Sequence, residues 1–105
     1  MATIMIVDDS SDSTYRLAKS LQDARYTTIT ILPGQTTAFA DTRPDILLVN
    51  SAYIGDIRNY AWIKSRAKIS REYSRPSESS DTPLVRVRLT MTPVEYVASL
   101  MVGLL

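Results

Sequence analysis

Thr3-Ile4-Met5-Ile6-Val7-Asp8-Asp9 is the stretch of sequence that decides the predicted fold. Residues 3–7 form a largely apolar, β-branched run, the pattern of a strand that is buried on both faces, and an acidic pair ends it. Ile46-Leu47-Leu48-Val49 is a second run of this kind, which follows Arg43-Pro44-Asp45 and ends at Asn50. We therefore predict two buried strands, over 3–7 and 46–49.

The segments around these runs predict a helix and a further strand. Ser10 and Ser11 offer an N-cap, and apolar residues then recur at helical spacing to about Arg25. Residues 27–32 are rich in threonine and isoleucine and stop at Pro33-Gly34, which predicts a strand closed by a turn. A short helix is expected at about 35–41 and a loop over 51–55.

The middle of the chain is predicted to be a long basic helix. From about Asp56 to Tyr73 apolar residues alternate with bases, and the polar residues 74–81 then predict a surface loop. Residues 58–105 carry eight bases against four acids, whereas residues 1–57 carry four bases against seven acids. Six of these eight bases lie between residues 58 and 75: Arg58, Lys64, Arg66, Lys68, Arg71 and Arg75. They indicate either a solvated helix face or a surface for an acidic or nucleic-acid partner.

The end of the chain predicts a strand and a capped helix. Over Leu84–Met91, Arg86 and Arg88 alternate with apolar residues, so this fourth strand is expected to have one wet face or to lie at a sheet edge. Thr92-Pro93-Val94-Glu95 has capping-box spacing with proline at the first helical position, and an apolar helix follows it.

Alternating strands and helices with short connections predict one architecture. The expected fold class is α/β, with a parallel sheet of about four strands and helices on both faces, in a shortened flavodoxin-like (βα)4 arrangement. Sites in such sheets form beyond the carboxyl ends of the strands, where Asp8, Asp9, Asn50 and Thr90 are expected. Two adjacent carboxylates suit Mg²⁺, but they also suit a helix N-terminus favoured by the helix dipole. Both interpretations of Asp8 and Asp9 stay open.

The amino-acid composition limits the kinds of domain and of functional site that the chain can form. The 105 residues, 45% hydrophobic and 22% charged, predict one globular domain over 1–105. Cysteine and histidine are absent, which excludes disulfides, thiol nucleophiles, imidazole bases and the usual zinc and haem ligands. No basic leader is evident, and no run approaches the roughly 20 apolar residues of a membrane span. We expect a cytoplasmic protein with no membrane partner.

The acidic pair and the proline-led third strand together resemble the receiver domains of two-component response regulators. The stretches concerned are Ile4 to Ser10 and Pro44 to Asn50, and the resemblance covers about residues 3–92. It implies that Asp8 and Asp9 stand where the family holds magnesium, that Thr90 stands at the switch hydroxyl, and that Asn50 replaces the phosphorylated aspartate.

Three departures from the family bear on its activity. The last lysine is Lys68, so the family's lysine partner of the phosphoryl group is missing, and Ile54 replaces a proline after the phosphoacceptor position. An amide is a poor nucleophile, so Asn50 cannot form an acyl phosphate. The resemblance therefore implies a pseudo-receiver that is not an enzyme, needs no cofactor and signals by protein–protein interaction in a prokaryotic-type regulatory system.

The final helix suggests where a partner binds. Its apolar residues occur nearly all round the predicted helix, and one four-stranded layer covers only part of such a surface. The expected interface comprises Val97, Leu100, Met101 and Leu104 with Arg86 and Arg88, used for a homodimer or another regulatory protein. The alternative is a helix that folds back onto the sheet as core.

Two other functional classes are alternatives to the protein-interaction module. An enzyme or small-ligand binder is disfavoured because the sequence has no glycine-rich phosphate loop and no acid–base pair besides Asp8 and Asp9. A nucleic-acid-binding or accessory module would use the basic 58–75 segment, with Tyr60, Trp62 and Tyr73 as stacking groups. Such aromatics are more often core or surface anchors, so nucleic acid is the less expected partner.

Overall fold

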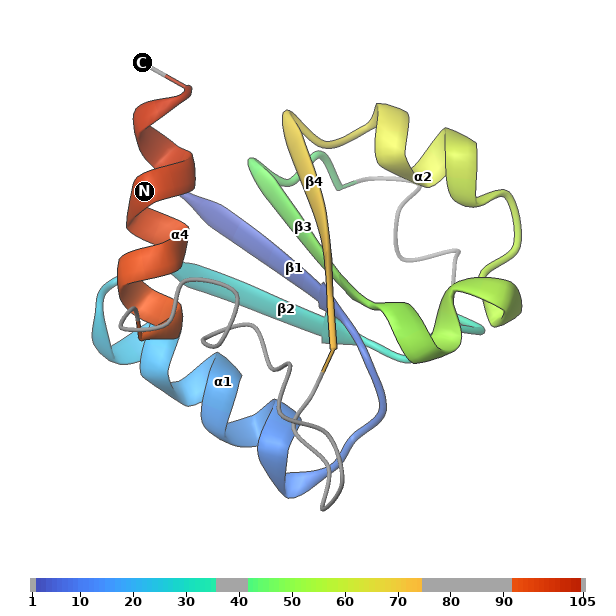
Figure 1. The fold of residues 1–105 in the computed structure, drawn as a ribbon, viewed down its shortest axis with the longest axis horizontal. Helices are drawn as coiled ribbons and strands as arrows, with labels where there is room; N and C mark the ends of the chain where they lie inside the picture. Colours follow the sequence, from blue (N-terminus) through green and yellow to red (C-terminus); the bar gives the residue numbers. More distant parts are fainter. Residues whose placement is uncertain (1, 36–41, 75–91, 105) are drawn as a thin grey trace.

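The computed structural model describes residues 2–35, 42–74 and 92–104, which form an α/β fold around one parallel sheet (Figure 1). The elements are β1 (Thr3–Val7), α1 (Asp12–Asp23), β2 (Thr27–Ile31), β3 (Ile46–Asn50), the 3₁₀ helix η2 (Ser51–Asp56), α2 (Tyr60–Ser65), β4 (Ile69–Tyr73) and α4 (Pro93–Val102). Helices α1 and α4 cover one face of the sheet, and η2 and α2 lie on the other (Figure 1). The predicted fold class is confirmed.

The sheet has the strand order β2-β1-β3-β4, and every pair of neighbours is parallel. Strand β1 is therefore bonded on both sides, with Ile4 level with Thr28 of β2 and with Ile46 of β3. This central position explains the apolar run that decides the fold, because a strand covered on both faces has no side that needs polar residues. The strands predicted over 3–7, 27–32 and 46–49 are present.

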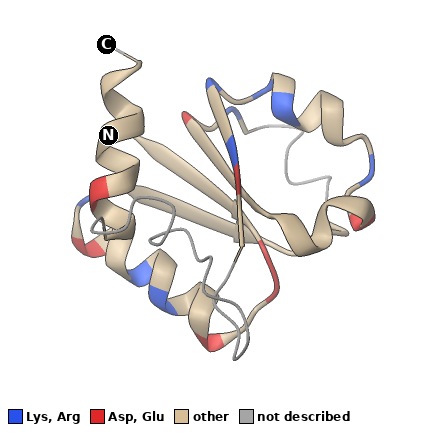
Figure 2. Ribbon diagram, in the orientation of Figure 1, with Lys and Arg blue, Asp and Glu red and all other residues tan. Residues whose placement is uncertain are grey.

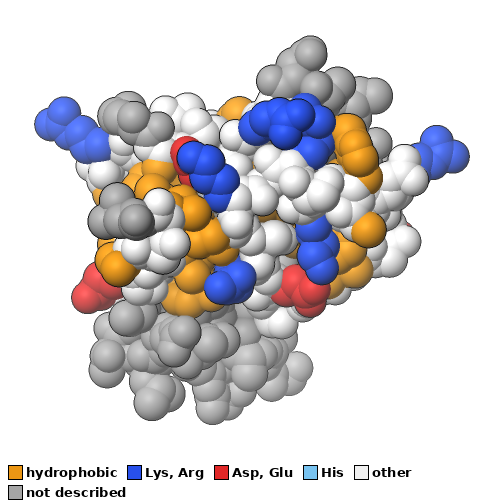
Figure 3. All heavy atoms as spheres, turned by 90° about the horizontal axis from the view of Figure 1, so that it is seen from above, with side chains coloured by type: hydrophobic (Ala, Val, Ile, Leu, Met, Phe, Trp, Pro, Cys, Tyr) orange, Lys and Arg blue, Asp and Glu red, His pale blue; other side chains and the backbone are white. Residues whose placement is uncertain are grey.

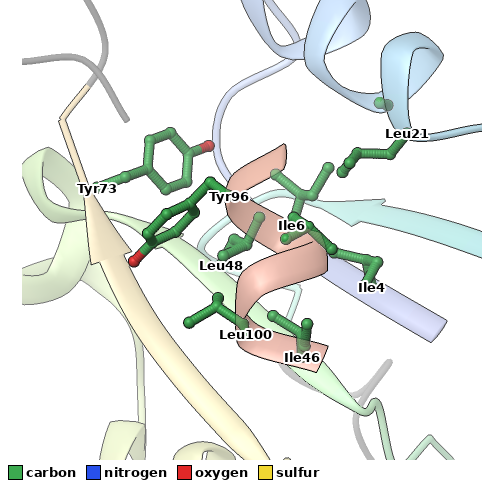
Figure 4. Packing of buried hydrophobic residues seen from close by; sticks show 10 residues of the cluster. Ile4, Ile6, Leu21, Ile46, Leu48, Tyr73, Tyr96 and Leu100 are labelled. Atoms are coloured by element: carbon green, nitrogen blue, oxygen red, sulfur yellow. The ribbon is translucent and has the colours of Figure 1, made fainter. Parts of the chain in front are cut away.

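The larger core lies between the sheet and the helices α1 and α4 (Figure 4). Ile4 and Ile6 of β1 point into it, and Leu21 of α1 and Val97 of α4 meet them without solvent exposure. Tyr73 from the end of β4 belongs to the same cluster and is 4% exposed. The full set is Ile4, Ile6, Ala18, Leu21, Ile46, Leu48, Tyr73, Tyr96, Val97 and Leu100.

The smaller core lies on the opposite face of the sheet. Side chains one position along the strands, such as Met5 and Leu47, point to this side because successive strand residues alternate between faces. Ile63 of α2 and Ile57 cover them, and Ile63 is fully buried. Short helices thus suffice to close this face.

Both long helices begin at the caps that the sequence predicts. The Ser11 hydroxyl accepts a hydrogen bond from the Thr14 backbone N–H at the start of α1. At the start of α4, the Thr92 hydroxyl accepts from the Glu95 N–H, and the Glu95 carboxylate accepts from the Thr92 N–H, which completes a capping box. Such caps satisfy N–H groups that the helix itself leaves unpaired.

The long helix predicted from Asp56 to Tyr73 is wrong. A 3₁₀ helix ends at Asp56, Asn59 takes the left-handed conformation at φ 58°, and α2 has only six residues. The chain then extends into β4, which pairs with β3 from Ile69 opposite Ile46 to Tyr73 opposite Asn50. Pairing with a buried strand satisfies the backbone groups of β4, and this outweighs the helix-like spacing of the apolar residues.

Several predictions lie outside the described residues. They concern the short helix at about 35–41, the strand over 84–91 with Arg86 and Arg88, and Thr90 at its end. The fourth strand of the described sheet is β4. Among the helices in the described ranges, none is long and apolar enough to cross a membrane.

Candidate functional site

The candidate site lies at the carboxyl edge of the sheet, where β1, β3 and β4 all end (Figure 1). Asp8 and Asp9 follow β1, Asn50 is the last residue of β3, and Tyr73 is the last residue of β4. Asp8 continues the line of β1, since its N–H donates to the Ile31 carbonyl at 3.2 Å. Parallel strands therefore bring these four side chains to one place.

The Asp8 carboxylate is fully buried and is surrounded by hydrogen-bond donors. Its Oδ1 accepts from the Asp9 backbone N–H at 2.7 Å and from the Asn50 side-chain amide at 2.9 Å. Its Oδ2 accepts from the Tyr73 hydroxyl at 2.6 Å. A buried carboxylate is tolerated only when such bonds replace its hydration, so these three donors stabilise the charge where it is.

The orientation of the Asn50 amide is fixed from both sides. Its Oδ1 accepts from the Ala52 N–H at 2.9 Å at the start of η2, which leaves its NH₂ group to face Asp8. An aspartate at position 50 could accept from Ala52 in the same way, but it would turn a second oxygen towards the Asp8 carboxylate. The amide is thus the side chain that fits this environment.

Asp9 is half-buried and joins the site to α1 and to η2. Its Oδ1 accepts from the Ser11 N–H at 3.1 Å and from the Thr14 hydroxyl at 3.4 Å, just before and within α1. Its Oδ2 accepts from the Tyr53 hydroxyl at 2.8 Å, which reaches over from η2. The helix-terminus interpretation of the acidic pair thus holds for Asp9, while Asp8 points into the sheet edge.

The contacts of the Asp8 carboxylate differ from those of a Mg²⁺ ligand. Magnesium takes oxygen ligands in a near-octahedral array, whereas the groups that donate to the Asp8 carboxylate include two N–H groups and a phenol O–H. The carbonyl oxygen of Asn50 is turned away to Ala52. Within the described ranges, no cluster of three or more acidic residues could hold a metal ion.

The structure brings together three of the four residues predicted for the pocket: Asp8, Asp9 and Asn50. Thr90 lies outside the described residues. Tyr73 and Tyr53, which donate to the two carboxylates, were not predicted for the pocket, and Tyr73 was named only as a stacking group of the nucleic-acid alternative. Tyr73 could have been found from its place at the end of a strand, had residues 69–73 been recognised as one; nothing local in the sequence marks Tyr53.

The opposite edge of the sheet carries a different aspartate. The Asp45 carboxylate accepts from the Thr3 backbone N–H at 2.8 Å and forms an ion pair with Lys68 at 3.1 Å. The Thr3 hydrogen bond, with a smaller effect from Lys68, holds the pKa of Asp45 below its ordinary value. These contacts tie the start of β1 to the segments that lead into β3 and β4.

The basic 58–75 segment does not form one helix face. Lys64 and Arg66 lie on or just after α2, and each has an aromatic ring beneath it, at 5.1 Å to the Tyr60 centroid and 4.9 Å to the Trp62 centroid. Arg71 lies in β4. Burial, and next the Glu72 carboxylate, raise the pKa of Tyr60 to about 12.

The predicted interface residues of α4 have different environments. Val97 is fully buried and Leu100 is 8% exposed, both in the core against β1 and β3, so the interface prediction is wrong for these two residues. The sheet and α1 together cover this side of α4, which is the alternative that the sequence left open. Met101 and Leu104 are half-buried, and Val102 is 68% exposed.

Comparison with known proteins gives no relative. A scan against protein-family models found no match, and searches of the curated proteins and of the solved structures found none either. The functional argument therefore depends on the chain's own residues.

Proposed function

We propose that this chain is a phosphorylation-independent relative of receiver domains that regulates another protein by binding to it, without catalysis and without a metal cofactor. The observation that carries the proposal is the buried Asp8 carboxylate, which is held by the Asn50 amide and the Tyr73 hydroxyl. A receiver needs this position for a cation beside a nucleophilic carboxylate. Here the Asn50 amide stands in place of the nucleophilic carboxylate, and Asn50 and Tyr73 donate to Asp8 where the family has a cation.

The absence of a nucleophile at position 50 supports the non-enzymatic part of the proposal. The Asn50 amide nitrogen is committed to Asp8 and its oxygen to the Ala52 N–H. Neither atom is a useful nucleophile, because the amide is neutral and its lone pair is delocalised. A receiver-like fold that lacks a nucleophile at this edge would act by binding another protein and not by phosphoryl transfer.

The nucleic-acid alternative gains no support from the arrangement of the bases. Lys68 pairs with Asp45 at the amino edge of the sheet, and Arg71 lies on β4. Non-specific nucleic-acid binding uses a continuous track of cations along the phosphate backbone. These bases are distributed over different elements, so protein association remains the better proposal.

The phosphorylation part is tested with a small phosphodonor. The protein is incubated with acetyl phosphate and MgCl₂, and its intact mass is measured before and after. We expect no phosphoryl adduct on the wild-type protein. An adduct that is lost at alkaline pH, as an acyl phosphate is, would contradict the proposal.

The association part is tested by affinity capture from cells that contain the protein, with and without acetyl phosphate. The same partner should be recovered under both conditions. Recovery only after phosphodonor treatment, or no saturable partner, would contradict it.

Self-association through the outer side of α4 is part of the same proposal. Val102 is a large apolar residue of α4 that is 68% exposed, so Val102→Glu should convert a dimer into a folded monomer in light scattering. Ser20→Glu on α1, which is exposed and adds the same charge, is the control and should leave the mass unchanged. A wild-type monomer at all concentrations would remove the homodimer and leave a different protein as the partner.

A further inference from the structure

Helix α2 presents a polar and aromatic surface away from the core. Only Ile63 is fully buried, whereas Ala61, Trp62, Lys64 and Ser65 are exposed. Trp62 is 46% exposed although it is a large apolar side chain. We call Arg58, Ala61, Trp62, Lys64 and Ser65 the α2 surface.

The charges on the α2 surface all have one sign. Residues 57–67 contain three bases and no acid, and Figure 2 shows basic colour on α2 and on the loop that leads into it. Arg58 and Lys64 are exposed, and neither takes part in the salt bridges Lys19–Asp23 and Lys68–Asp45 of the described residues. Their positive charge is therefore available to a partner.

The aromatic groups at this surface are held in place. The Tyr60 hydroxyl donates to Glu72 of β4 at 3.3 Å, and Lys64 lies over the Tyr60 ring. Arg66 lies over the Trp62 ring, and the Ser65 hydroxyl donates to the Trp62 carbonyl at 2.6 Å. Rings that are already ordered lose little conformational entropy when a partner covers them, which is why tryptophan and tyrosine anchor many interfaces.

Seen from above, the molecule has Lys and Arg side chains spread among apolar ones (Figure 3). Two further bases of the described residues, Lys68 and Arg71, cannot join the α2 surface. Lys68 is paired with Asp45, and Arg71 shares the face of β4 that carries Tyr73, towards α4. Two exposed cations, one on α2 and one just before it, are too few for a phosphate backbone, which typically takes about six to ten contacts. They match a short segment with a few carboxylates.

We infer that the α2 surface binds an acidic segment of a partner protein. Carboxylates of that segment pair with Arg58 and Lys64, and one apolar side chain covers Trp62. Arginine suits this role because its planar fork binds a carboxylate through two hydrogen bonds. The inference rests on the proposed function, since it names the surface and the partner chemistry through which association occurs.

Trp62 is the only tryptophan of the chain, so its fluorescence reports directly on this surface. The full chain is titrated with an oligo-glutamate peptide that carries one central leucine, with the oligo-glutamine equivalent of the same length, and with oligothymidylate. We expect saturable fluorescence changes with the acidic peptide and none with the glutamine peptide.

Two double variants of equal charge test the assignment. Arg58→Gln with Lys64→Gln should weaken binding of the acidic peptide by about tenfold or more, as expected from the loss of two charge-assisted contacts. Arg16→Gln with Lys19→Gln removes the same charge from exposed positions of α1 and should leave the affinity unchanged. Thermal unfolding of both variants checks that they are folded.

Three results would overturn the inference: no saturable change with the acidic peptide, equal weakening by both double variants, or tighter and steeply salt-dependent binding of oligothymidylate. Its failure is distinguishable from failure of the proposed function. A partner captured equally well by the Arg58→Gln, Lys64→Gln protein would keep the association and place it on another surface, whereas a phosphoryl adduct would contradict the proposed function itself.

Discussion

Asp8 and Asp45 lie at opposite edges of the same sheet, and each joins β1 to β3 and β4 in a different way. At the carboxyl edge, the fully buried Asp8 is held by a backbone N–H, the Asn50 amide and the Tyr73 hydroxyl. At the amino edge, the half-buried Asp45 is held by the Thr3 N–H and by the exposed cation of Lys68.

The difference follows from the cost of removing charges from water. A buried lysine beside Asp8 would have to be desolvated together with the carboxylate, whereas neutral donors stabilise the charge without that penalty. At the amino edge Lys68 keeps its ammonium in solvent, with 67% of the side chain exposed. The carboxylate at the carboxyl edge is therefore buried among neutral donors, whereas the ion pair at the amino edge is partly exposed, so its contribution depends on salt and pH.

Among the substitutions that test the two edges, Asn50→Asp should have the largest effect on the free energy of unfolding. It replaces the amide that donates to Asp8 by a second carboxylate, so two buried like charges face each other across a 2.9 Å contact. We expect a loss of about 3 kcal/mol in the free energy of unfolding in metal-free buffer, measured by urea denaturation. Added Mg²⁺ should recover part of this loss in the variant.

The control for this variant is Asn50→Ser, which keeps a neutral donor of smaller size. It should lose less stability than Asn50→Asp and should not respond to Mg²⁺. An Asn50→Asp protein as stable as the wild type without metal would show that the Asn50 amide does not hold Asp8.

Tyr73→Phe has the next largest expected effect. It removes the hydroxyl from Asp8 Oδ2 but keeps the ring in the core with Tyr96 and Leu100. Loss of one hydrogen bond to a buried charge should cost about 2 kcal/mol in the free energy of unfolding, measured by chemical denaturation. Tyr26→Phe, at a half-buried ring that packs against the same core, is the matched control and should change stability little.

Asp45→Ala tests the amino edge. It removes the acceptor for the Thr3 N–H and the partner of Lys68, and we expect a loss of about 1.5 kcal/mol at neutral pH. The pKa of folded Asp45 lies below its ordinary value of 3.8, so its contribution is fully present above about pH 5 and is lost as pH falls through the folded pKa.

The pH dependence separates this contribution from simple loss of packing. The stability difference between wild type and Asp45→Ala should narrow as pH is lowered below about 4, followed by chemical denaturation at several pH values. A difference that stays constant with pH would assign the effect to packing and not to the carboxylate.

Lys68→Gln should have the smallest effect. The ion pair with Asp45 is exposed on the lysine side, so its loss should cost about 0.3 kcal/mol, and less at high salt. Thermal unfolding at low and high ionic strength measures it. A loss as large as that of Asp45→Ala would mean that Lys68, and not the Thr3 N–H, is the main partner of Asp45.

The elements that could be predicted are those whose residue pattern has a single structural explanation. Strands β1 and β3 are apolar except at Thr3 and Asn50, because both of their faces are covered, and the caps of α1 and α4 are local hydrogen-bonding patterns. Strand β4 could not be recognised, since three of its five residues, Ser70, Arg71 and Glu72, are polar. Its pairing with β3 is a tertiary effect that the spacing of residues does not reveal.

The candidate site was found in part for the same reason. Asp8, Asp9 and Asn50 follow strands that the sequence marks clearly, so their meeting at one edge was predictable. Tyr73 was missed together with β4, and Tyr53 reaches Asp9 across 44 positions of the chain. Val97 and Leu100 were wrongly predicted to lie at an interface, because an apolar helix does not show in its sequence which side the sheet will cover.

The most direct test of the central claim is a Mg²⁺ titration of the wild-type protein, followed by its melting temperature. A ligand that binds the folded state raises this temperature in a saturable, concentration-dependent way. If the Asp8 carboxylate is held by Asn50 and Tyr73 as described, the melting temperature should not change with Mg²⁺ beyond the change in a NaCl series of equal ionic strength. A saturable rise specific to Mg²⁺ would show that a metal ion binds the folded protein. It would contradict the proposal that neutral donors alone hold the Asp8 carboxylate.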